Sequence, residues 1–273
     1  MTTGEFELVE WIRSRFPLTG DDCAVVEPPA GRLLLAADAI VEGVDFEQPY
    51  APGEVGYRAV LVNASDIAAM GGRPLHVLVS ILAPAGVDVR ALLDGVADGV
   101  RAHGCEVAGG DLSGTSGPLV ASVAITGTVD DGGAPVLRSG ARAGDGVFVT
   151  GPLGAAAAAG YRFGPTWRPL ARVAEGTAAR LAGATAMIDV SDGFAADLGH
   201  LCDASGVGVV LHDVPIAAGA TEEQALGGGE DYELLFTLPP GAVAPSGSIA
   251  VGTIVEDRSA RPPAVAGWQH RFS

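Results

Sequence analysis

Six aspartates of this 273-residue chain stand in short, otherwise apolar segments, several of which contain glycine. They are Asp22, Asp38, Asp66, Asp111, Asp189 and Asp192. Several follow directly on runs of residues typical of β-strands, and carboxylates at the ends of buried strands gather at one edge of a sheet. Carboxylate oxygens are the ligands that hard cations such as Mg²⁺ prefer. We therefore expect these aspartates to hold magnesium and, through it, a polyanion.

Each aspartate also has an ordinary structural explanation. Aspartate next to glycine is common in turns and at helix N-termini. Asp189 and Asp192 flank Ser191 directly before an apolar helical segment, so a helix cap and a metal role are both compatible with their positions. A turn or cap explains any single aspartate well, whereas six in one chain favour a metal site.

The chain contains no lysine, and all 16 of its basic residues are arginine. A P-loop and the protein-kinase, Schiff-base and Ser-Lys mechanisms all need a lysine, so these classes are excluded. The sequence also lacks the Gly-x-Ser-x-Gly and His-Glu-x-x-His motifs, and its five histidines are dispersed. We therefore expect no covalent nucleophile.

Metal-assisted phosphoryl transfer suits this set of residues, because positioning and charge neutralisation supply most of its catalysis. An acceptor that is itself a phosphate has a second pKa of about 6, is largely ionised at neutral pH and needs no general base. Arg138 has the planar guanidinium that clamps a nucleotide phosphate, although a solvated or interdomain ion pair would explain it equally well. The net charge of −17 disfavours nucleic acids and anionic membranes as partners.

The cysteines and the N-terminus indicate the compartment. Cys23, Cys105 and Cys202 are odd in number and far apart, which predicts reduced thiols rather than disulfides or a zinc site. The N-terminal segment contains acidic residues and no long apolar run, so it predicts an amphipathic helix and no signal peptide. No uninterrupted apolar stretch is long enough to cross a membrane. A cytoplasmic protein is the expectation.

The hydrophobic pattern predicts a mixed α/β chain with two domains. In the first half, helices are expected at 5–15, 54–69 and 88–102, and strands at 23–26, 32–37, 75–83 and 119–129. A polar, glycine-rich stretch at 130–145 is the candidate junction, and gives domains of residues 1–135 and 136–273. In the second half, helices are expected at 154–160, 170–182 and 193–204, and strands at 147–150, 186–190, 207–211, 232–238 and 249–254.

Seven short motifs follow one another along almost the whole chain. They are GDDCAVV (20–26), DAIVEGVDF (38–46), NASDIAAMGGRP (63–74), AGGDLS (108–113), VLRSGARAGD (136–145), DVSDGFAADLGH (189–200) and GGEDYELLF (228–236). Their order and spacing resemble the thiamine-monophosphate kinase family, which makes thiamine diphosphate from thiamine monophosphate and ATP. The wider group contains aminoimidazole ribonucleotide synthetase, and the resemblance implies its two-domain α/β fold with mixed sheets and a homodimer formed by the N-terminal domains.

The resemblance also implies roles for particular residues. The six aspartates would hold several Mg²⁺ ions between the phosphates of ATP and the acceptor phosphate. The nucleotide would contact Gly110, Asp111, Arg138 and Ser191. The substrate would contact Asp45, Glu230 and Trp268, and an aromatic face against a cationic thiazolium is also physically reasonable.

Three departures from the family pattern bear on the substrate. Ala36 and Ala37 replace residues that usually include a hydroxyl, so backbone carbonyls or water must substitute for a hydroxyl ligand to metal. Asp45 stands where the family commonly has histidine, which puts an acceptor in place of a phosphate-binding donor. The linking segment 163–173 is shorter than usual. Two alternatives therefore stay open: a kinase of the same group with another small phosphorylated substrate, and a non-catalytic nucleotide-binding relative.

Overall fold

The computed structural model of the chain describes residues 11–16, 30–129, 132–162, 164, 167–265 and 267–268. Asp22, Cys23 and the strand predicted at 23–26 lie outside these residues. The chain divides into two compact units, the first made of Met1–Ile67 and Arg73–Gly132 and the second of Ala68–Gly72 and Gly133–Ser273. Each unit contains a β-sheet with helices packed on it, so the predicted mixed α/β fold is confirmed.

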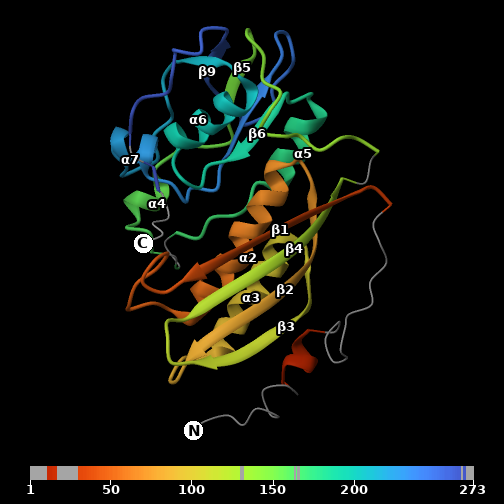
Figure 1. The fold of residues 1–273 in the computed structure, drawn as a ribbon, viewed down its shortest axis with the longest axis vertical. Coiled ribbons are helices and arrows are strands. Elements are labelled where there is room, and N and C mark those ends of the chain that lie inside the picture. The colour runs from red at the N-terminus through yellow and green to blue at the C-terminus, as the bar shows by residue number, and fades with distance from the viewer. Residues whose placement is uncertain are drawn as a thin grey trace. The chain divides into compact units, whose positions relative to one another are not determined.

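The first unit contains a four-stranded sheet in the order β1-β4-β2-β3. Its strands are β1 (Arg32–Val41), β2 (Arg73–Pro84), β3 (Glu106–Thr115) and β4 (Val120–Val129). The pairs β1–β4 and β4–β2 are antiparallel, whereas β2 and β3 are parallel. Helices α2 (Pro52–Ala69) and α3 (Val89–His103) cover one face of this sheet (Figure 1). The edge strands are therefore β1 and β3.

The two helices of the first unit pack with their backbones in close contact. A Cβ atom on Gly56 would lie 2.0 Å from the carbonyl oxygen of Leu92, and one on Gly95 would lie 1.8 Å from that of Gly53. Helix α3 begins after Asp88, whose side chain accepts a hydrogen bond from the Ala91 N–H group. The glycines of both helices thus set the close spacing of this layer.

The two faces of the first sheet differ in exposure. On the face that α2 and α3 cover, Val77, Val79 and Val123 are at most 5% exposed. The opposite face is called the outer face from here on. It carries four leucines that are 52%, 72%, 52% and 40% exposed, namely Leu33, Leu35, Leu78 and Leu82. This apolar surface is large for a sheet that faces water.

A one-residue bulge in β3 changes which face its side chains occupy. Leu78 of β2 pairs with Gly109, while the residue before Leu78 pairs with Val107, so Ala108 has no partner in the ladder. Because side chains alternate along a strand, one extra residue moves the following side chains to the other face. Asp111 therefore lies on the outer face, the same face as Leu78.

The second unit contains a five-stranded antiparallel sheet in the order β6-β8-β5-β9-β7. Its strands are β5 (Gly146–Val149), β6 (Ala186–Asp189), β7 (Gly208–Leu211), β8 (Leu234–Leu238) and β9 (Ile249–Val255). Its helices are α4 (Ala155–Ala158), α5 (Val173–Leu181), α6 (Phe194–Ser205) and α7 (Glu222–Gly227). One core contains Leu198 and Leu201 of α6, and a second contains Ala179 of α5 with Met187 and Phe236. Helices therefore pack on both faces of this sheet.

The predicted helices and strands that fall on described residues are present, with their ends shifted by a few residues. Of the helix predicted at 5–15, residues 11–15 are described and helical. Two elements were not predicted, the strand β3 and the short helix α7. Among the helices described, none is both long and apolar enough to cross a membrane.

Candidate functional site

Residues 189–192 and 230–233 run side by side in the second unit. The N–H groups of Glu230 and Tyr232 donate to the carbonyl oxygens of Ser191 and Val190 at 2.8 and 3.0 Å. The Val190 N–H group donates in return to the carbonyl oxygen of Glu233 at 2.8 Å. These backbone bonds join two motifs that are about 40 residues apart in the sequence.

A third segment reaches the same place from the C-terminal end of the chain. The Trp268 N–H group donates to the carbonyl oxygen of Asp192 at 2.9 Å, and the Trp268 side chain is 49% exposed. The structure therefore brings together five of the predicted site residues, namely Asp189, Ser191, Asp192, Glu230 and Trp268. The backbone of Trp268 thus lies beside that of Asp192.

The turn that carries Ser191 and Asp192 is closed by a side chain that was not predicted. One carboxylate oxygen of Asp197, Oδ2, accepts hydrogen bonds from the N–H groups of Ser191, Asp192 and Gly193, each at 3.1 Å. Helix α6 begins after Gly193, so the idea that Asp189 or Asp192 caps it is wrong. The sequence signal would have been an aspartate in the first turn of the helix that follows the Ser-Asp-Gly turn.

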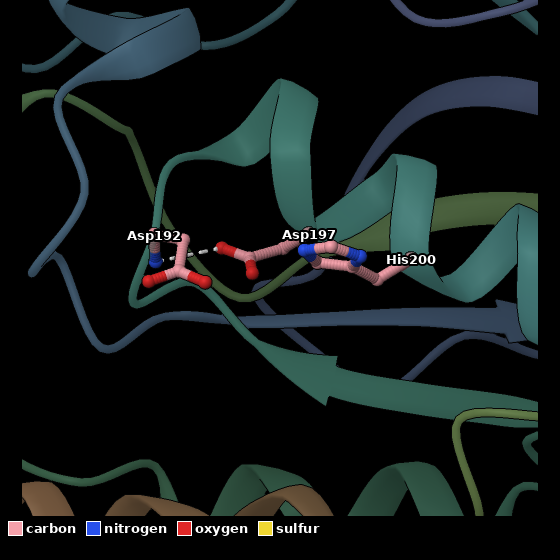
Figure 2. Close-up of side chains that lie close together, drawn as sticks. All are labelled: Asp192, Asp197 and His200. Atoms are coloured by element: carbon pink, nitrogen blue, oxygen red, sulfur yellow. Dashed lines mark hydrogen bonds between the residues drawn. The ribbon is translucent and has the colours of Figure 1, made fainter. Parts of the chain in front are cut away.

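Asp197 is also the centre of a small polar cluster (Figure 2). Ligand atoms of Asp192, Asp197 and His200 all lie within 4.8 Å of one another. Burial raises the pKa of Asp197 to about 8, and the negative charges of Asp189 and Asp192 add to this rise. Asp197 therefore lies close to other negative charges, and His200 is exposed at the rim of the cluster.

The segment that carries Glu230 has an unusual backbone. Glu230 and Tyr232 have φ angles of 57° and 53°, in the left-handed region that side chains rarely adopt. Two anchors hold this segment. Asp231 accepts hydrogen bonds from the N–H groups of Gly154 and Ala156 at 2.6 and 3.0 Å. The carboxylate of Glu233, two residues after Asp231, is bound by Arg172, whose Nε lies 2.9 Å from Oε2.

A buried asparagine, Asn63, binds the backbone of Asp38 and lies one helical turn before Asp66. Asn63 is fully buried on α2, and its Oδ1 accepts the backbone N–H group of Asp38 at 3.0 Å. Its amide nitrogen donates to the carbonyl oxygen of Ala59 at 2.9 Å. Asp66 follows Asn63 by one turn on the same helix face. Asn63 was not predicted as a site residue, and it holds β1 against α2 beside both aspartates.

Asp38 and Asp111 lie far apart in the first sheet. Asp38 pairs with Val123 on the helix-covered face, whereas Asp111 lies on the outer face. Their strands, β1 and β3, are the two edges, so three strand spacings of roughly 14 Å in total separate them. The expectation that the aspartates end strands and meet at one sheet edge is therefore wrong for this pair. Asp66, on a helix, does not end a strand either.

Gly110 and Asp45 each lie against backbone atoms of the first unit. A Cβ atom on Gly110 would lie 1.9 Å from the carbonyl oxygen of Val79, so only glycine fits where β3 meets β2. The Asp45 Oδ2 atom accepts the N–H group of Val41 at 2.7 Å and closes the turn after β1.

Arg138 lies at the other end of α6 from Ser191. The hydroxyl of Ser205, the last residue of α6, donates to the carbonyl oxygen of Arg138 at 3.4 Å. Ser191 precedes the first residue of the same helix, whose 12 residues span roughly 18 Å. The structure does not bring Arg138 and Ser191 together within the second unit.

The two described thiols are not suited to nucleophilic catalysis. Burial raises the pKa of Cys105 to about 12 and that of Cys202 to about 11, so both are protonated at neutral pH. Neither takes part in a disulfide. These thiols therefore give no support to a covalent mechanism.

The chain is similar to known proteins in both sequence and structure. Residues 20–129 match the family described as AIR synthase related protein, N-terminal domain. The chain is 38% identical over 251 residues to thiamine-monophosphate kinase of Methanospirillum hungatei, which covers 85% of each chain. The chain thus contains a domain that matches the N-terminal domain of proteins related to AIR synthase.

Solved structures agree with this over nearly the full length. Thiamine-monophosphate kinase from Stenotrophomonas maltophilia has a TM-score of 0.81 and 30% identity, and the match covers 97% of this chain and 98% of that one. A structure described as AaThiL complexed with AMPPCP and TMP has a TM-score of 0.79 and 33% identity, with 98% and 97% covered. The chain belongs to the thiamine-monophosphate kinase family.

Proposed function

We propose that this protein transfers the terminal phosphate of ATP to thiamine monophosphate. The bond between the terminal phosphorus and its bridging oxygen breaks, a new bond forms to an acceptor phosphate oxygen, and thiamine diphosphate and ADP leave. The observation that carries the proposal is the meeting of Asp189, Ser191 and Asp192 with Glu230 and Trp268 in the second unit. The similar protein whose structure contains AMPPCP and TMP supports the same donor and acceptor.

The aspartates fit magnesium because all of them offer oxygen ligands. In this proposal Asp189 and Asp192 of the second unit are magnesium ligands, and so are Asp22, Asp38, Asp66 and Asp111 of the first. Magnesium would neutralise the phosphate charges that oppose the approach of an ionised acceptor. An acceptor phosphate that is already ionised needs no general base.

The remaining polar residues would hold the two substrates. Ser191, Gly110, Asp111 and Arg138 are proposed nucleotide contacts, although Arg138 acts apart from Ser191. Glu230 and Trp268 would face the thiamine moiety, because a carboxylate and an aromatic ring both attract a cationic thiazolium. Asp45 would contact the substrate through Oδ1, because its Oδ2 accepts the Val41 N–H group. We place the reaction in the cytoplasm, where ATP is available.

We further propose that a second copy of the chain covers the outer face of the first sheet. Four exposed leucines on that face form an apolar surface suited to an isologous dimer. Asp111 lies on the same face, opposite to the face of Asp38. In a dimer built this way, Asp111 of one copy would lie at the interface, on the opposite face of the sheet from Asp38 of its own copy.

Mixing two inactive variants tests this arrangement. Asp38→Asn and Asp111→Asn should each abolish transfer alone. If each site takes its Asp38 and its Asp111 from different copies, mixed dimers contain one intact site, and an equal mixture regains about a quarter of wild-type activity. Analytical ultracentrifugation of Leu35→Glu should show a monomer. No recovery on mixing, with subunit exchange verified by mass spectrometry, would show that each site takes both aspartates from one copy.

The activity itself is tested with purified protein, Mg²⁺, ATP and thiamine monophosphate. We expect thiamine diphosphate and ADP in equal amounts, measured by chromatography. ADP formed only with a different phosphorylated acceptor would indicate a kinase with another substrate. Tight ATP binding by calorimetry without ADP production from any acceptor would indicate a non-catalytic nucleotide-binding protein.

A further inference from the structure

The turn at residues 190–193 is organised around a single buried oxygen. Three consecutive N–H groups, those of Ser191, Asp192 and Gly193, converge on Asp197 Oδ2 at 3.1 Å each. Asp197 is only 2% exposed, and Figure 2 shows its carboxylate directed at the turn that carries Asp192. The shape of this turn thus depends on one carboxylate.

Converging N–H groups at the start of a helix normally form a site for an external anion. Successive N–H groups make a concave anion site, and the helix dipole of α6 adds to its attraction. Here the chain fills the site with its own side chain. A nucleotide phosphate is therefore kept from these N–H groups, and the carboxylate of Asp192 is left as the group that this turn offers to a cation.

The geometry points to Asp197 as a positioning residue that orients Ser191 and Asp192 for nucleotide and metal. This inference rests on the proposed function, which assigns those two residues their ligands. Asp197 Oδ2 is surrounded by three donors inside the fold, so it holds the turn rather than the metal. Asp197 acts on the metal through Asp192, in the way that groups behind metal ligands orient them.

The experiment measures metal binding separately from turnover. Full-length wild type, Asp197→Asn and Asp197→Ala are titrated with Mn²⁺ and ATP, and bound Mn²⁺ is followed by electron paramagnetic resonance. We expect Asp197→Ala to weaken Mn²⁺ binding and lower kcat by about tenfold or more, with KM for thiamine monophosphate changed less than threefold. Asp197→Asn should lose less, because its amide oxygen can accept the same N–H groups. Melting temperature reports the fold, and Asp197→Asn decides the question if Asp197→Ala does not fold.

Two variants on the same helix serve as controls. Asp203 lies exposed at the far end of α6 and pairs with Arg261. The variant Asp203→Asn should therefore bind Mn²⁺ like the wild type. His200→Gln should also be close to wild type. An equal loss in His200→Gln and Asp197→Ala would show that the cluster binds the ion directly, and would overturn the inference. Wild-type Mn²⁺ binding in Asp197→Ala would overturn it as well. Absence of Mn²⁺ binding by the wild type would instead overturn the proposed function, and this inference with it.

Discussion

The anchor between Arg172 and Glu233 lends itself to a quantitative test. The Glu233 side chain is 7% exposed and that of Arg172 is 34% exposed. Arg172 binds both carboxylate oxygens through Nε and Nη2, and the Thr150 hydroxyl donates to the same carboxylate. Arg172→Ala would leave the buried Glu233 carboxylate with the Thr150 hydroxyl as its side-chain donor. Glu233 lies three residues after Glu230, at the end of the same segment.

The expected cost follows from burial and from the backbone that the anchor holds. Removing one partner of a fully buried ion pair costs about 3–5 kcal/mol. Because a third of the Arg172 side chain is exposed, water will solvate part of the remaining charge, and about 2 kcal/mol is expected. For a unit of this size, 2 kcal/mol corresponds to a fall in Tm of about 4–8 °C.

The functional effect should be confined to one substrate. Glu230 and Tyr232 occupy the left-handed region, at a cost of about 1–3 kcal/mol each, and need surrounding contacts to stay there. Loss of the anchor should let this segment relax, raising KM for thiamine monophosphate about tenfold, while KM for ATP changes less than KM for thiamine monophosphate. Initial-rate kinetics at saturating levels of the other substrate separate the two constants.

A double-mutant cycle decides whether the pair itself is responsible. Arg172→Ala, Glu233→Gln and the double variant should show a coupling energy of about 1–2 kcal/mol in urea unfolding. Arg261→Ala, which breaks an exposed pair with Asp203, is the matched control and should cost less than about 1 kcal/mol. Additive costs in the cycle, or equal rises in KM for ATP and thiamine monophosphate, would refute the reasoning.

Three further predictions concern the first unit. Burial lowers the pKa of His103 below its usual 6.5. As the pH falls below 6.5 the unfolded state therefore binds more protons than the folded state, and the free energy of unfolding falls by at most about 1.4 kcal/mol per pH unit. In urea unfolding between pH 7 and 5, His103→Gln should show a weaker dependence of this free energy on pH than the wild type, and an unchanged dependence would contradict this. Asn63→Ala removes the acceptor for the Asp38 N–H group and should lower the free energy of unfolding by about 2 kcal/mol while raising the Mg²⁺ concentration needed for activity. Asp66→Asn should abolish most phosphoryl transfer, and its Tm should change no more than that of the control Asp98→Asn, whose side chain is exposed. A wild-type rate of transfer would show that Asp66 is not a metal ligand.

Helix α2 and strand β4 could be predicted because their residue types favour one structure along the whole element. Helix α2 has 18 residues with no proline after its first position, and β4 is rich in β-branched residues. Strand β3 could not, because Gly109, Gly110 and Asp111 have the composition of a turn. It forms a strand because β2 approaches so closely that a Cβ on Gly110 would lie 1.9 Å from the Val79 oxygen. That approach is a tertiary contact that no local pattern contains.

The candidate site was predictable as a set of residues but not as an arrangement. The motifs identified Asp192 and Glu230, which the backbone bonds of the second unit bring together. Asp197 was missed because its role arises only when three N–H groups converge at the start of α6. The opposite faces of Asp38 and Asp111 were missed because a bulge of one residue leaves no mark in the pattern of hydrophobicity.

The unpaired Ala108 in β3 has a genetic consequence. Deletion of its single codon would restore regular alternation, turning Asp111 and Ser113 beneath the helices and Leu112 outward. This single deletion would move Asp111 away from the outer face, which a second copy would contact, and would change no other residue in the sequence. The same step would place a carboxylate in an apolar layer, at a desolvation cost of several kcal/mol. Selection on stability alone would therefore retain the extra residue, and with it any dependence of one copy on another.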